Sequence, residues 1–432
     1  MILPSIDLMN GKAVQLRQGK KKILEKDHPV ELARDFSRYG EIAVIDLDSA
    51  FDTRQNEKII GEICAVGECR VGGGIRSLDK AKRILSLGAE KIIIGTMALK
   101  DGRINLAFLD KLVTFVGKKR VIIALDSFDG EIVTKGWQER SGLSCESILK
   151  ELEPYASEFL LTRVDKEGVM KGTDLNFFKR LRDKTEIPLT AAGGISTLEE
   201  ISYLSNQGIN AQLGMALYRE KILLTEAFIV SLKWKNDLIP TVTVDPSQQV
   251  LMLAYSNQES LRRTFKTGKV WYFSRSRNSL WLKGETSGNV QHFLRVRSDC
   301  DGDALLITAK QQGEACHTGR YSCFGNRMFS LIELYDVIHD RLKSAAPSSY
   351  SASLDKNRLE AKIREETEEL IEAEKREDII WEASDLLYFL MVLLARNEIP
   401  FSDVLWELGR RRHTPKMSDL KVEEECDEKA QD

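Results

Sequence analysis

The sequence predicts a multidomain protein in which an α/β (β/α)₈ barrel precedes a mostly β α+β domain and an all-α domain. Three observations lead to this fold class. Strand-like and helical segments alternate up to about residue 225, β-branched and aromatic residues dominate from about 240 to 297, and two long helical patterns follow residue 355. At 432 residues the chain also exceeds the length of one ordinary domain.

The N-terminal half alternates short apolar runs with amphipathic stretches such as 78–88 and 198–208. Repeated strand–helix units of this kind predict a parallel sheet. The runs number close to eight over the length typical of a closed barrel, although periodicity leaves the open doubly wound sheet as an alternative. The clearest runs are 2–7, 42–47, 91–95, 121–126, 159–162 and 188–191.

Changes in composition set the expected domain limits. We expect the barrel over residues 1–228, the mostly β domain over 229–335 and the helical domain over 345–415. Residues 344–353, SAAPSSYSAS, have the composition of a linker. The charged segment 416–432 is expected to be disordered.

The overall composition, 42% apolar and 30% charged, is that of a soluble globular protein, and a net charge of −3 argues against a nucleic-acid binder. No run approaches the roughly 18 apolar residues of a membrane span, and the N-terminus MILPSIDLMNGK does not resemble a secretory signal. Seven cysteines, an odd number in a long chain, favour reduced thiols and a metal site over disulfides. We therefore expect a cytoplasmic protein that binds neither nucleic acid nor membrane.

Two carboxylates, Asp7 and Asp126, end strand-like runs of the predicted barrel. Strand ends converge at one face of a barrel, where such a pair could supply a general acid and a general base. An aspartate at a strand end also commonly caps the next helix, so either residue alone is weak support.

Glycine-rich turns follow four of the apolar runs and precede helical segments. Backbone N–H groups in such turns, together with a helix N-terminus, can hold a phosphate. Four turns on what should be opposite sides of a barrel suggest a substrate with a phosphate at each end. The residues expected to bind it are Gly74, Gly95, Thr96, Gly193, Gly194 and Gly214.

The motifs IDLMNGKAVQLRQG, VIDLDSAF, VGGGIRSLDKA, IIIGT, ALDSFDGEIVTKGWQE, AAGGIS and LGMALY extend over nearly all of residues 1–222. Together they resemble phosphoribosylformimino-AICAR-phosphate isomerase, a family of (β/α)₈ barrels that convert an aminoaldose to an aminoketose. The Gly136-Trp137 pair favours the isomerase over the related cyclase barrel.

This resemblance implies that Asp7 and Asp126 are the acid/base pair and that Thr162 helps to position the ring-opening chemistry. It also implies that Trp137 stacks on the substrate, and the alternative for Trp137 is a core aromatic. The chain departs from the family pattern at two positions. Gln15 stands where an arginine is expected, and Glu167 where an aspartate is expected before Gly168. A barrel retained only as a scaffold is therefore the alternative to an active isomerase.

The middle region contains the motif Asp-Cys-Asp-Gly-Asp at 299–303, followed by Cys316-His317 and Cys323. Three thiolates suit Zn²⁺ and leave a fourth position for a water, whose pKa zinc lowers to about 7. Alternating aspartates point to one side of an extended segment and suit Mg²⁺, and His317 is a candidate proton shuttle. A structural zinc site or buried free thiols are the alternatives. The expected ligands are Cys300, Cys316 and Cys323 for zinc and Asp299, Asp301 and Asp303 for magnesium.

The stretches VLMLAYSNQESL, YFSRSRNSLWLKGETSGN, DCDGDALL and CHTGRYSCF resemble phosphoribosyl-AMP cyclohydrolase over about residues 235–328. The resemblance implies zinc-assisted opening of the adenine ring at the N1–C6 bond and a homodimer whose cysteine ligands can come from both subunits. It also implies that substrate is bound by Ser274, Arg275, Ser276, Arg277, Trp281, Lys283, Glu285, Thr286, Ser287, Gly288 and Asn289.

The C-terminal helical patterns carry carboxylates at helical spacing, Glu366 and Glu369 on the first and Glu382 and Asp385 on the second. Facing each other, they could hold Mg²⁺ on a polyphosphate that Lys362 also contacts. Acidic helix faces are usually solvated, but the second pair lies within a heavily apolar helix that must face a core. The expected magnesium ligands are Glu365, Glu366, Glu369, Glu382 and Asp385.

The segments SYSASL, KIREETEE, EASDLLYFLMVLL and LGRRRH resemble phosphoribosyl-ATP pyrophosphohydrolase over residues 349–413. Taken alone, this region could equally be another nucleotide pyrophosphohydrolase or an oligomerisation bundle. Its position after a cyclohydrolase favours the first assignment, because that pair is a known fusion.

The three resemblances imply a trifunctional enzyme of histidine biosynthesis. It would hydrolyse phosphoribosyl-ATP to phosphoribosyl-AMP and pyrophosphate, open the adenine ring, and isomerise the resulting aminoaldose. The alternative is a bifunctional hydrolase with an inactive barrel. Zn²⁺ and Mg²⁺ are the expected cofactors, with no organic cofactor, and phosphoribosyl nucleotides are the expected small-molecule ligands.

Overall fold

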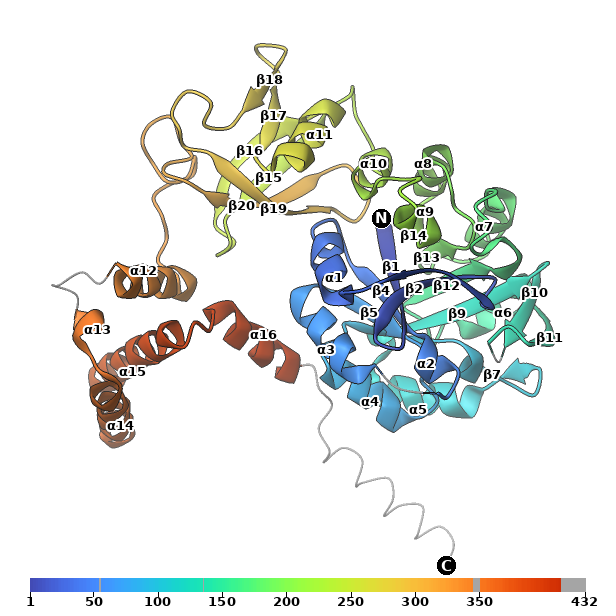
Figure 1. Cartoon of the computed structure of the whole chain (residues 1–432), viewed down its shortest axis with the longest axis horizontal. Coiled ribbons are helices and arrows are strands. Elements are labelled where there is room, and N and C mark those ends of the chain that lie inside the picture. Colours follow the sequence, from blue (N-terminus) through green and yellow to red (C-terminus); the bar gives the residue numbers. More distant parts are fainter. Residues whose placement is uncertain (54–55, 135, 345–349, 413–432) are drawn as a thin grey trace, which may run out of the picture.

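The first half of the chain is a closed ring of eight parallel strands in the order β1-β4-β5-β6-β9-β12-β13-β14, with β14 paired back to β1 (Figure 1). The computed structural model describes residues 1–53, 56–134, 136–344 and 350–412. Closure of the ring confirms the predicted barrel and excludes the open doubly wound sheet. The strands are β1 (Ile2–Met9), β4 (Ile42–Asp46), β5 (Cys69–Gly72), β6 (Lys91–Ile94), β9 (Val121–Phe128), β12 (Glu158–Arg163), β13 (Leu189–Ala192) and β14 (Ile209–Leu213).

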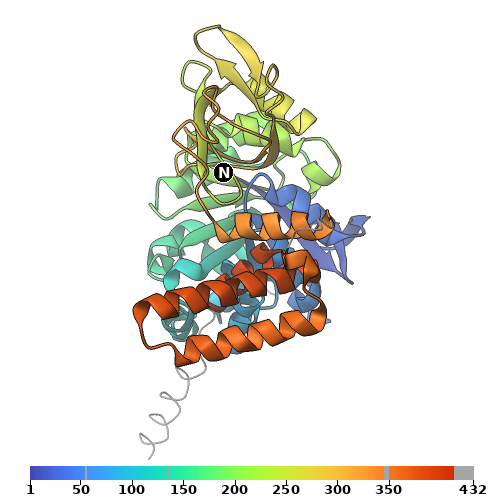
Figure 2. The ribbon, with the colours of Figure 1, turned by 90° about the vertical axis from the view of Figure 1, so that its left-hand side faces the viewer.

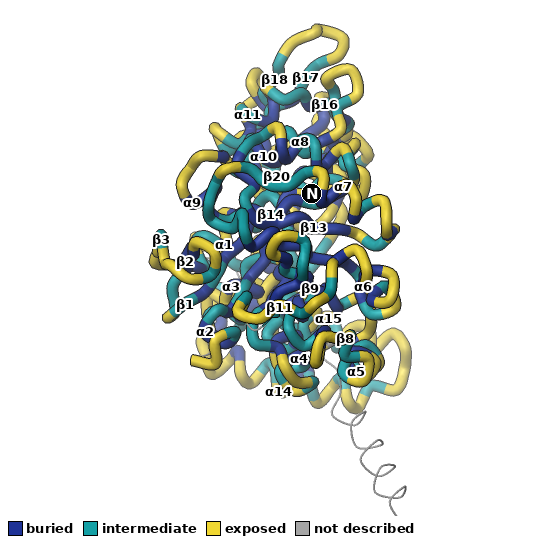
Figure 3. Tube along the Cα trace, turned by 90° about the vertical axis from the view of Figure 1, so that its right-hand side faces the viewer, coloured by how far each residue is buried: buried dark blue, intermediate teal, exposed yellow. Residues whose placement is uncertain are grey.

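The barrel strands are buried on both faces, which explains why their sequences are apolar runs rather than alternating patterns. Ile93, Ile122 and Leu160 belong to a small cluster inside the ring. A larger core lies between the ring and its outer helices, and Figure 3 shows β13 and β14 deeply buried. The helices are α1 (Pro29–Ser37), α3 (Glu57–Val66), α4 (Leu78–Ser86), α5 (Leu106–Val116), α6 (Cys145–Leu152), α7 (Leu175–Arg182), α8 (Leu198–Asn206) and α10 (Leu224–Val230), with the short α2 (Leu47–Ala50) and α9 (Met215–Tyr218).

Two hairpins extend the barrel beyond the ends of β1 and β9. The first continues β1 through β2 (Lys12–Arg17) and β3 (Lys21–Lys26), and the second continues β9 through β10 (Glu131–Thr134) and β11 (Glu139–Ser144). A smaller hairpin joins β7 (Leu99–Lys100) to β8 (Arg103–Ile104). Since β1 and β9 occupy opposite positions in the ring, the two larger hairpins flank the same mouth from opposite sides.

The middle domain is built on a four-stranded sheet of order β16-β15-β20-β19, with the hairpin β17–β18 and one helix, α11, beside it. This architecture confirms the predicted sheet-rich fold. Its core includes Ile239, Leu251, Tyr272 and Val296. The elements are β15 (Ile239–Val244), β16 (Val250–Ser256), α11 (Gln258–Thr267), β17 (Trp271–Ser274), β18 (Ser279–Leu282), β19 (Gln291–Ser298) and β20 (Leu305–Gln311).

The C-terminal domain is helical, and its two longest helices lie antiparallel beside each other (Figure 2). These helices, α14 (Lys356–Glu372) and α15 (Arg376–Arg396), correspond to the two predicted patterns. Three further helices, in addition to the two long patterns, are α12 (Leu331–Lys343), α13 (Tyr350–Ser353) and α16 (Phe401–Arg412).

Helix α12 contributes Tyr335 and Ile338 to the core of this domain, and α13 falls within the stretch predicted as a linker. The segment 416–432, for which disorder was expected, lies outside the described residues.

Helix α16 reaches back to the outer surface of the barrel (Figure 1). The indole of Trp406 covers Gly88, where an added Cβ would lie 2.8 Å from the ring. The guanidinium of Arg410 also donates a hydrogen bond to the carbonyl of Ser86. Among the helices that the structure describes, none is both long enough and apolar enough to cross a membrane.

The three candidate active sites

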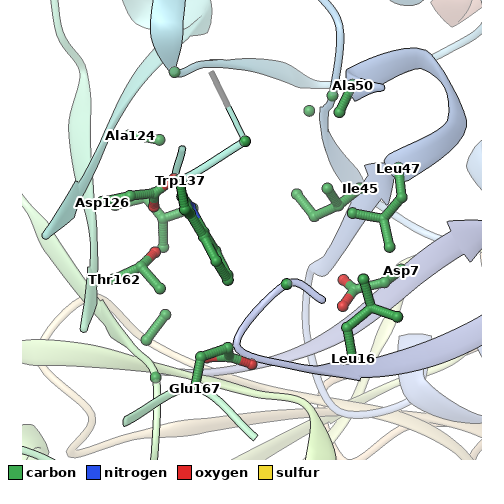
Figure 4. Close-up of a pocket in the computed structure, with 18 of the residues that line it drawn as sticks. Asp7, Leu16, Ile45, Leu47, Ala50, Ala124, Asp126, Trp137, Thr162 and Glu167 are labelled. Carbon is green, nitrogen blue, oxygen red and sulfur yellow. The ribbon is translucent and has the colours of Figure 1, made fainter. Parts of the chain in front are cut away.

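The mouth of the barrel holds a cavity of about 260 Å³ at the C-terminal ends of the strands (Figure 4). Asp7 enters it from β1 and Asp126 from β9, which lie on opposite sides of the ring. Thr162, at the end of β12, lies beside Asp126 because Thr162 and Asp126 are register partners. The structure therefore brings together the three residues that the sequence assigned to isomerase chemistry.

Burial at the mouth makes ionisation of both aspartates less favourable. It raises the pKa of Asp7 to about 6, against a hydrogen bond of 2.8 Å from the hydroxyl of Ser5 that favours the charged form. Burial likewise raises the pKa of Asp126, against hydrogen bonds from Trp137 and Thr162. Two carboxyl groups that titrate nearer to neutral pH than usual are suited to exchange protons with a substrate.

A third carboxyl group, that of Glu167, lines the same cavity. Burial and the nearby charges of Asp7 and Asp126 raise its pKa to about 8. Figure 4 shows Glu167 below the space that separates the two aspartates. The sequence singled out Glu167 only as a departure from the isomerase pattern. Its place in the loop that follows barrel strand β12 was the available indication that it belongs to the site.

Trp137, at the tip of the β10–β11 hairpin, is held over the mouth by two contacts. Its indole N–H donates to Asp126 Oδ2 at 2.8 Å. Its ring lies so close to the backbone of Gly19 that a Cβ there would be 2.6 Å from a ring carbon. The backbone φ of Trp137 is +68°, a left-handed conformation that is uncommon for a bulky residue. The ring is therefore fixed against the Asp126 carboxylate rather than packed in the core.

The glycine turns line two opposite walls of the cavity. Gly74 and Gly95 follow the adjacent strands β5 and β6, whereas Gly194 and Gly214 follow the adjacent strands β13 and β14 across the ring. Gly193, with φ of +91°, has no room for a side chain, because a Cβ would lie 2.4 Å from the carbonyl oxygen of Arg163. Thr96 and Gly193 also line the cavity, so all six predicted turn residues face one space.

Gln15 is buried against the turn at Gly214, where an added Cβ would lie 2.7 Å from the Gln15 amide oxygen. This neutral side chain therefore lies beside one of the candidate phosphate turns. Compared with the expected arginine, Gln15 removes a positive charge from that wall of the cavity but still fills the space beside Gly214.

In the middle domain, Cys316 and Cys323 lie close together. Burial and the neighbouring Cys316 thiol raise the pKa of Cys323, and the buried Lys283 ammonium faces the same two sulfurs. Within the described residues, Cys300 does not join them in a group whose ligand atoms all lie within 4.8 Å of one another. His317, next to Cys316, is exposed. One chain thus brings together two of the three predicted zinc ligands.

The oxygens of Asp299, Asp301 and Asp303 lie within 4.8 Å of one another on the turn between β19 and β20. Asp299 Oδ1 accepts the N–H groups of Gly302, Asp303 and Ala304 at 2.9, 2.9 and 3.1 Å, which fixes the turn. Repulsion from Asp301 raises the pKa of Asp303. Crowded carboxylates that repel one another fit a hard divalent cation such as Mg²⁺.

The predicted substrate-binding residues of the middle domain follow the β17–β18 hairpin and the loop after it. The Arg275 guanidinium stacks 3.8 Å over the ring of Tyr255, and Arg277 Nε donates to Ser274 Oγ at 3.2 Å. The Lys283 ammonium donates to the carbonyl of Asn289 at 3.4 Å. Trp281 packs against Tyr272 behind them. The exposed arginines and the loop 284–289 together form a surface suited to an anionic ligand.

In the helical domain, carboxylates from α14 and α15 meet. Glu366, which is only 4% exposed, lies with Glu382 and Asp385 so that their ligand oxygens are within 4.8 Å of one another. Glu365 and Glu369 complete a second such group around Glu366. The Lys362 ammonium forms ion pairs with Glu365 at 2.9 Å and with Glu366 at 3.2 Å. A buried carboxylate within an acidic cluster fits a metal ion better than a solvated helix face.

Family models match three successive parts of the chain. The model described as histidine biosynthesis protein matches residues 1–223. A model of phosphoribosyl-AMP cyclohydrolase matches residues 252–325, and one of phosphoribosyl-ATP pyrophosphohydrolase matches residues 331–412. The three matches follow the order of the barrel, the sheet domain and the helical domain.

Curated relatives divide in the same way. The chain is 39% identical to a phosphoribosyl imidazole-4-carboxamide isomerase of Methanocaldococcus jannaschii, over 52% of this chain and 97% of that protein. It is 40% identical to the histidine biosynthesis bifunctional protein HisIE of Pyrococcus furiosus, over 43% of this chain and 98% of that protein. It is 46% identical to a histidine biosynthesis trifunctional protein of Kluyveromyces lactis, over 39% of this chain and 22% of that protein. The chain therefore belongs to the histidine biosynthesis protein family, as an enzyme in which a barrel of that family precedes phosphoribosyl-AMP cyclohydrolase and phosphoribosyl-ATP pyrophosphohydrolase domains.

Proposed function

We propose that the chain catalyses three successive reactions on phosphoribosyl nucleotides. The helical domain hydrolyses phosphoribosyl-ATP to phosphoribosyl-AMP and pyrophosphate, the sheet domain opens the adenine ring by zinc-assisted hydrolysis, and the barrel isomerises the aminoaldose product to the aminoketose. The observation that supports isomerisation by the barrel is the opposition of Asp7 and Asp126 across one cavity. We keep the domain limits 1–228, 229–335 and 345–415 as part of the proposal.

Aldose–ketose isomerisation requires a proton for the ring oxygen, removal of a proton from the adjacent carbon, and return of a proton to the former aldehyde carbon. Asp7 and Asp126 are placed to share these transfers from opposite faces of a bound substrate. The glycine turns on the two remaining walls would hold its two phosphates. Trp137, released from Asp126, would stack on the substrate between them.

In the sheet domain, Cys316 and Cys323 fit a soft cation, and Cys300 of a second copy of the chain would complete the set of three thiols. When bound, zinc supplies hydroxide at neutral pH. His317 would carry protons to and from the ring nitrogen, while Arg275 and Lys283 hold the anionic substrate. Asp299, Asp301 and Asp303 would bind Mg²⁺.

A homodimer through the sheet domain would bring Cys300 of one chain to the paired thiols of the other. Phe324, Met328 and Phe329 next to Cys323 support such a contact, because they are 69%, 63% and 75% exposed. We expect sedimentation of the purified chain at micromolar concentration to give the mass of a dimer. A chain that sediments as a monomer with bound zinc would contradict the shared site.

The proposed function is tested by supplying the purified chain with phosphoribosyl-ATP, Mg²⁺ and Zn²⁺ and separating the products by chromatography. Accumulation of the ketose is the expected result. Mass alone cannot decide, since aldose and ketose are isomers. If the reaction stops at the aldose, the barrel is a scaffold and the enzyme is bifunctional.

Removal of the second carboxylate pair tests the helical site. The double variant Glu382→Ala/Asp385→Ala is expected to lower pyrophosphate release at least about 10-fold, because two of the three carboxylates in the group that contains the buried Glu366 are lost. Pyrophosphate is measured directly with phosphoribosyl-ATP as substrate. Glu377→Ala, at an exposed position in the first turn of the same helix, is the matched control. Unchanged pyrophosphate release in the double variant would favour the alternative of an oligomerisation bundle.

The pKa of about 8 at Glu167 predicts a pH effect that can be measured in two ways. Isomerase activity should rise near pH 6 as Asp7 ionises and fall near pH 8 as Glu167 ionises. In Glu167→Gln, the fall of activity near pH 8 should disappear. Because the folded state disfavours ionised Glu167, wild-type stability falls as pH rises from about 4.5 through 8. Glu167→Gln should therefore raise the unfolding midpoint at pH 8.5 but not at pH 4. If the fall of activity near pH 8 persists in Glu167→Gln, that fall belongs to the ionisation of another group.

A further inference from the structure

The C-terminal end of barrel helix α1 lies directly against strand β19 of the sheet domain (Figure 1). The contact is made by residues 37–39, here called the docking segment. The carbonyl of Arg38 accepts a hydrogen bond from the backbone N–H of Val296 at 2.8 Å. The carbonyl of Ser37 accepts a second, at 3.0 Å, from the Arg297 guanidinium.

Aromatic packing surrounds these hydrogen bonds. The ring of Tyr39 lies 5.2 Å from that of Phe265 in an edge-on arrangement and 6.4 Å from that of Phe293. Phe228, on the last barrel helix α10, lies 6.2 Å from Tyr39. The Arg38 guanidinium covers the other side of Phe293 at 4.9 Å. Aromatic pairs of this kind contribute more stabilising free energy than the burial of their apolar surface alone would give.

Strand β19 is the outer strand of its sheet. Near its start, its free side is bonded to residues 268–270, because Val270 N–H donates to the carbonyl of Gln291 and Phe293 N–H to that of Gly268, both at 2.9 Å. The part of the strand after Phe293 needs another partner on that side. Its pairing with β20 is interrupted by a bulge between Phe293 and Arg295, next to the contact with Arg38. The Arg38 Nε also donates to the carbonyl of Leu294, within that bulge, at 3.3 Å. The barrel thus covers the later, irregular part of this sheet edge, which residues 268–270 do not reach.

Strand β19 ends at Ser298 and leads directly into the turn that carries Asp299, Asp301 and Asp303. Only two residues separate Val296, bonded to the barrel, from Asp299. Asp299 in turn accepts three backbone N–H groups of the turn. Displacement of β19 would therefore displace the three carboxylates together.

We propose that the docking segment of the barrel is a positioning element for the cyclohydrolase, holding β19 so that the Asp299–Asp303 turn keeps its cation-binding geometry. This inference rests on the proposed function for the identity of the reaction, but not for the contact itself. It gives the barrel a second role that does not depend on isomerase chemistry. Residues 37–39 are placed outside the barrel cavity.

The test uses the full chain with Tyr39→Ala, which removes the ring from the cluster. Tyr39→Phe keeps the ring and should behave as wild type. Arg34→Ala, at an exposed position on the same helix, is the control for an unrelated change in α1. Hydrogen–deuterium exchange is measured on the amides of Val296 and residues 302–304, with Mg²⁺ and Zn²⁺ present.

In Tyr39→Ala we expect these amides to exchange about 5–10-fold faster, as the loss of one aromatic contact implies. Exchange in the barrel strands and isomerase activity should be unchanged. The Mg²⁺ concentration for half-maximal ring opening should rise by a similar factor, with kcat at saturating Mg²⁺ retained.

Unchanged exchange at 296 and 302–304 in a folded Tyr39→Ala chain would overturn the proposal. So would faster exchange spread evenly over both domains, since the contact would then be structural only. If Tyr39→Ala fails to fold, Arg297→Met tests the same contact from the sheet side and leaves the rings intact. Absence of ring opening in wild type would refute the proposed function, whereas the exchange measurement would still decide the positioning role.

Discussion

Replacement of Asp7 by Asn is expected to lower kcat for isomerisation by about 10²–10⁴-fold, the range typical for loss of a general acid or base. With a pKa of about 6, the Asp7 carboxylate is mostly ionised at pH 7 yet basic enough to accept a proton. Asparagine has nearly the same shape and still accepts the Ser5 hydrogen bond, but it cannot take up a proton. The ring-opening and pyrophosphate-releasing steps should be unaffected.

The measurement is steady-state isomerisation of supplied aminoaldose. Asp129→Asn is the control, because Asp129 lies exposed in the turn between β9 and β10 at a φ of +52°, which asparagine tolerates. Isomerase activity of Asp7→Asn within threefold of wild type would mean that Asp7 is not the acid or base, and would reopen the scaffold alternative.

Replacement of Cys316 by Ala is expected to reduce ring opening by about 10³-fold or more and to release zinc. The expectation follows because zinc lowers the pKa of a bound water from its far higher bulk value to about 7, so that loss of the metal would remove nearly all hydroxide at neutral pH. Cys316 lies beside Cys323 in one chain, so the two thiols that remain after its replacement would form an incomplete zinc site.

Zinc content by elemental analysis and ring opening of phosphoribosyl-AMP are measured on the same preparations. Cys145→Ala, a buried thiol on barrel helix α6, is the control for cysteine loss outside the proposed site. Stoichiometric zinc with full activity in Cys316→Ala would remove the thiol from the ligand set. Isomerase activity should persist in both variants.

The barrel and its opposed aspartates were predictable because local features determine them. A buried parallel strand must be apolar, so β1 and β9 appear as runs, and their carboxylates mark the strand ends. Strands β5 and β14 were not among the clearest runs, because CRVG is short and INAQL carries polar residues. Their existence was indicated by the glycine turns at Gly74 and Gly214 and by the count of units that closure requires.

The position of Glu167 could not be predicted, since it depends on how the loop after β12 folds back over the mouth. The extent of helices α12 and α16 could not be predicted for a related reason. Both carry mixed polar and apolar faces whose partners, the α15 helix and the barrel surface around Gly88, are distant in sequence. In contrast, helical periodicity alone placed Glu366 with Glu369 and Glu382 with Asp385.

The closed ring of barrel strands cannot form until its last strand has been synthesised. Strand β1 leaves the ribosome before the other barrel strands, yet it closes the barrel by pairing Ile2 with Ala211. At about 5–20 residues per second, roughly 10–40 s pass between the appearance of these two partners. During that interval β1 has an unpaired apolar edge that nascent-chain chaperones would be expected to cover.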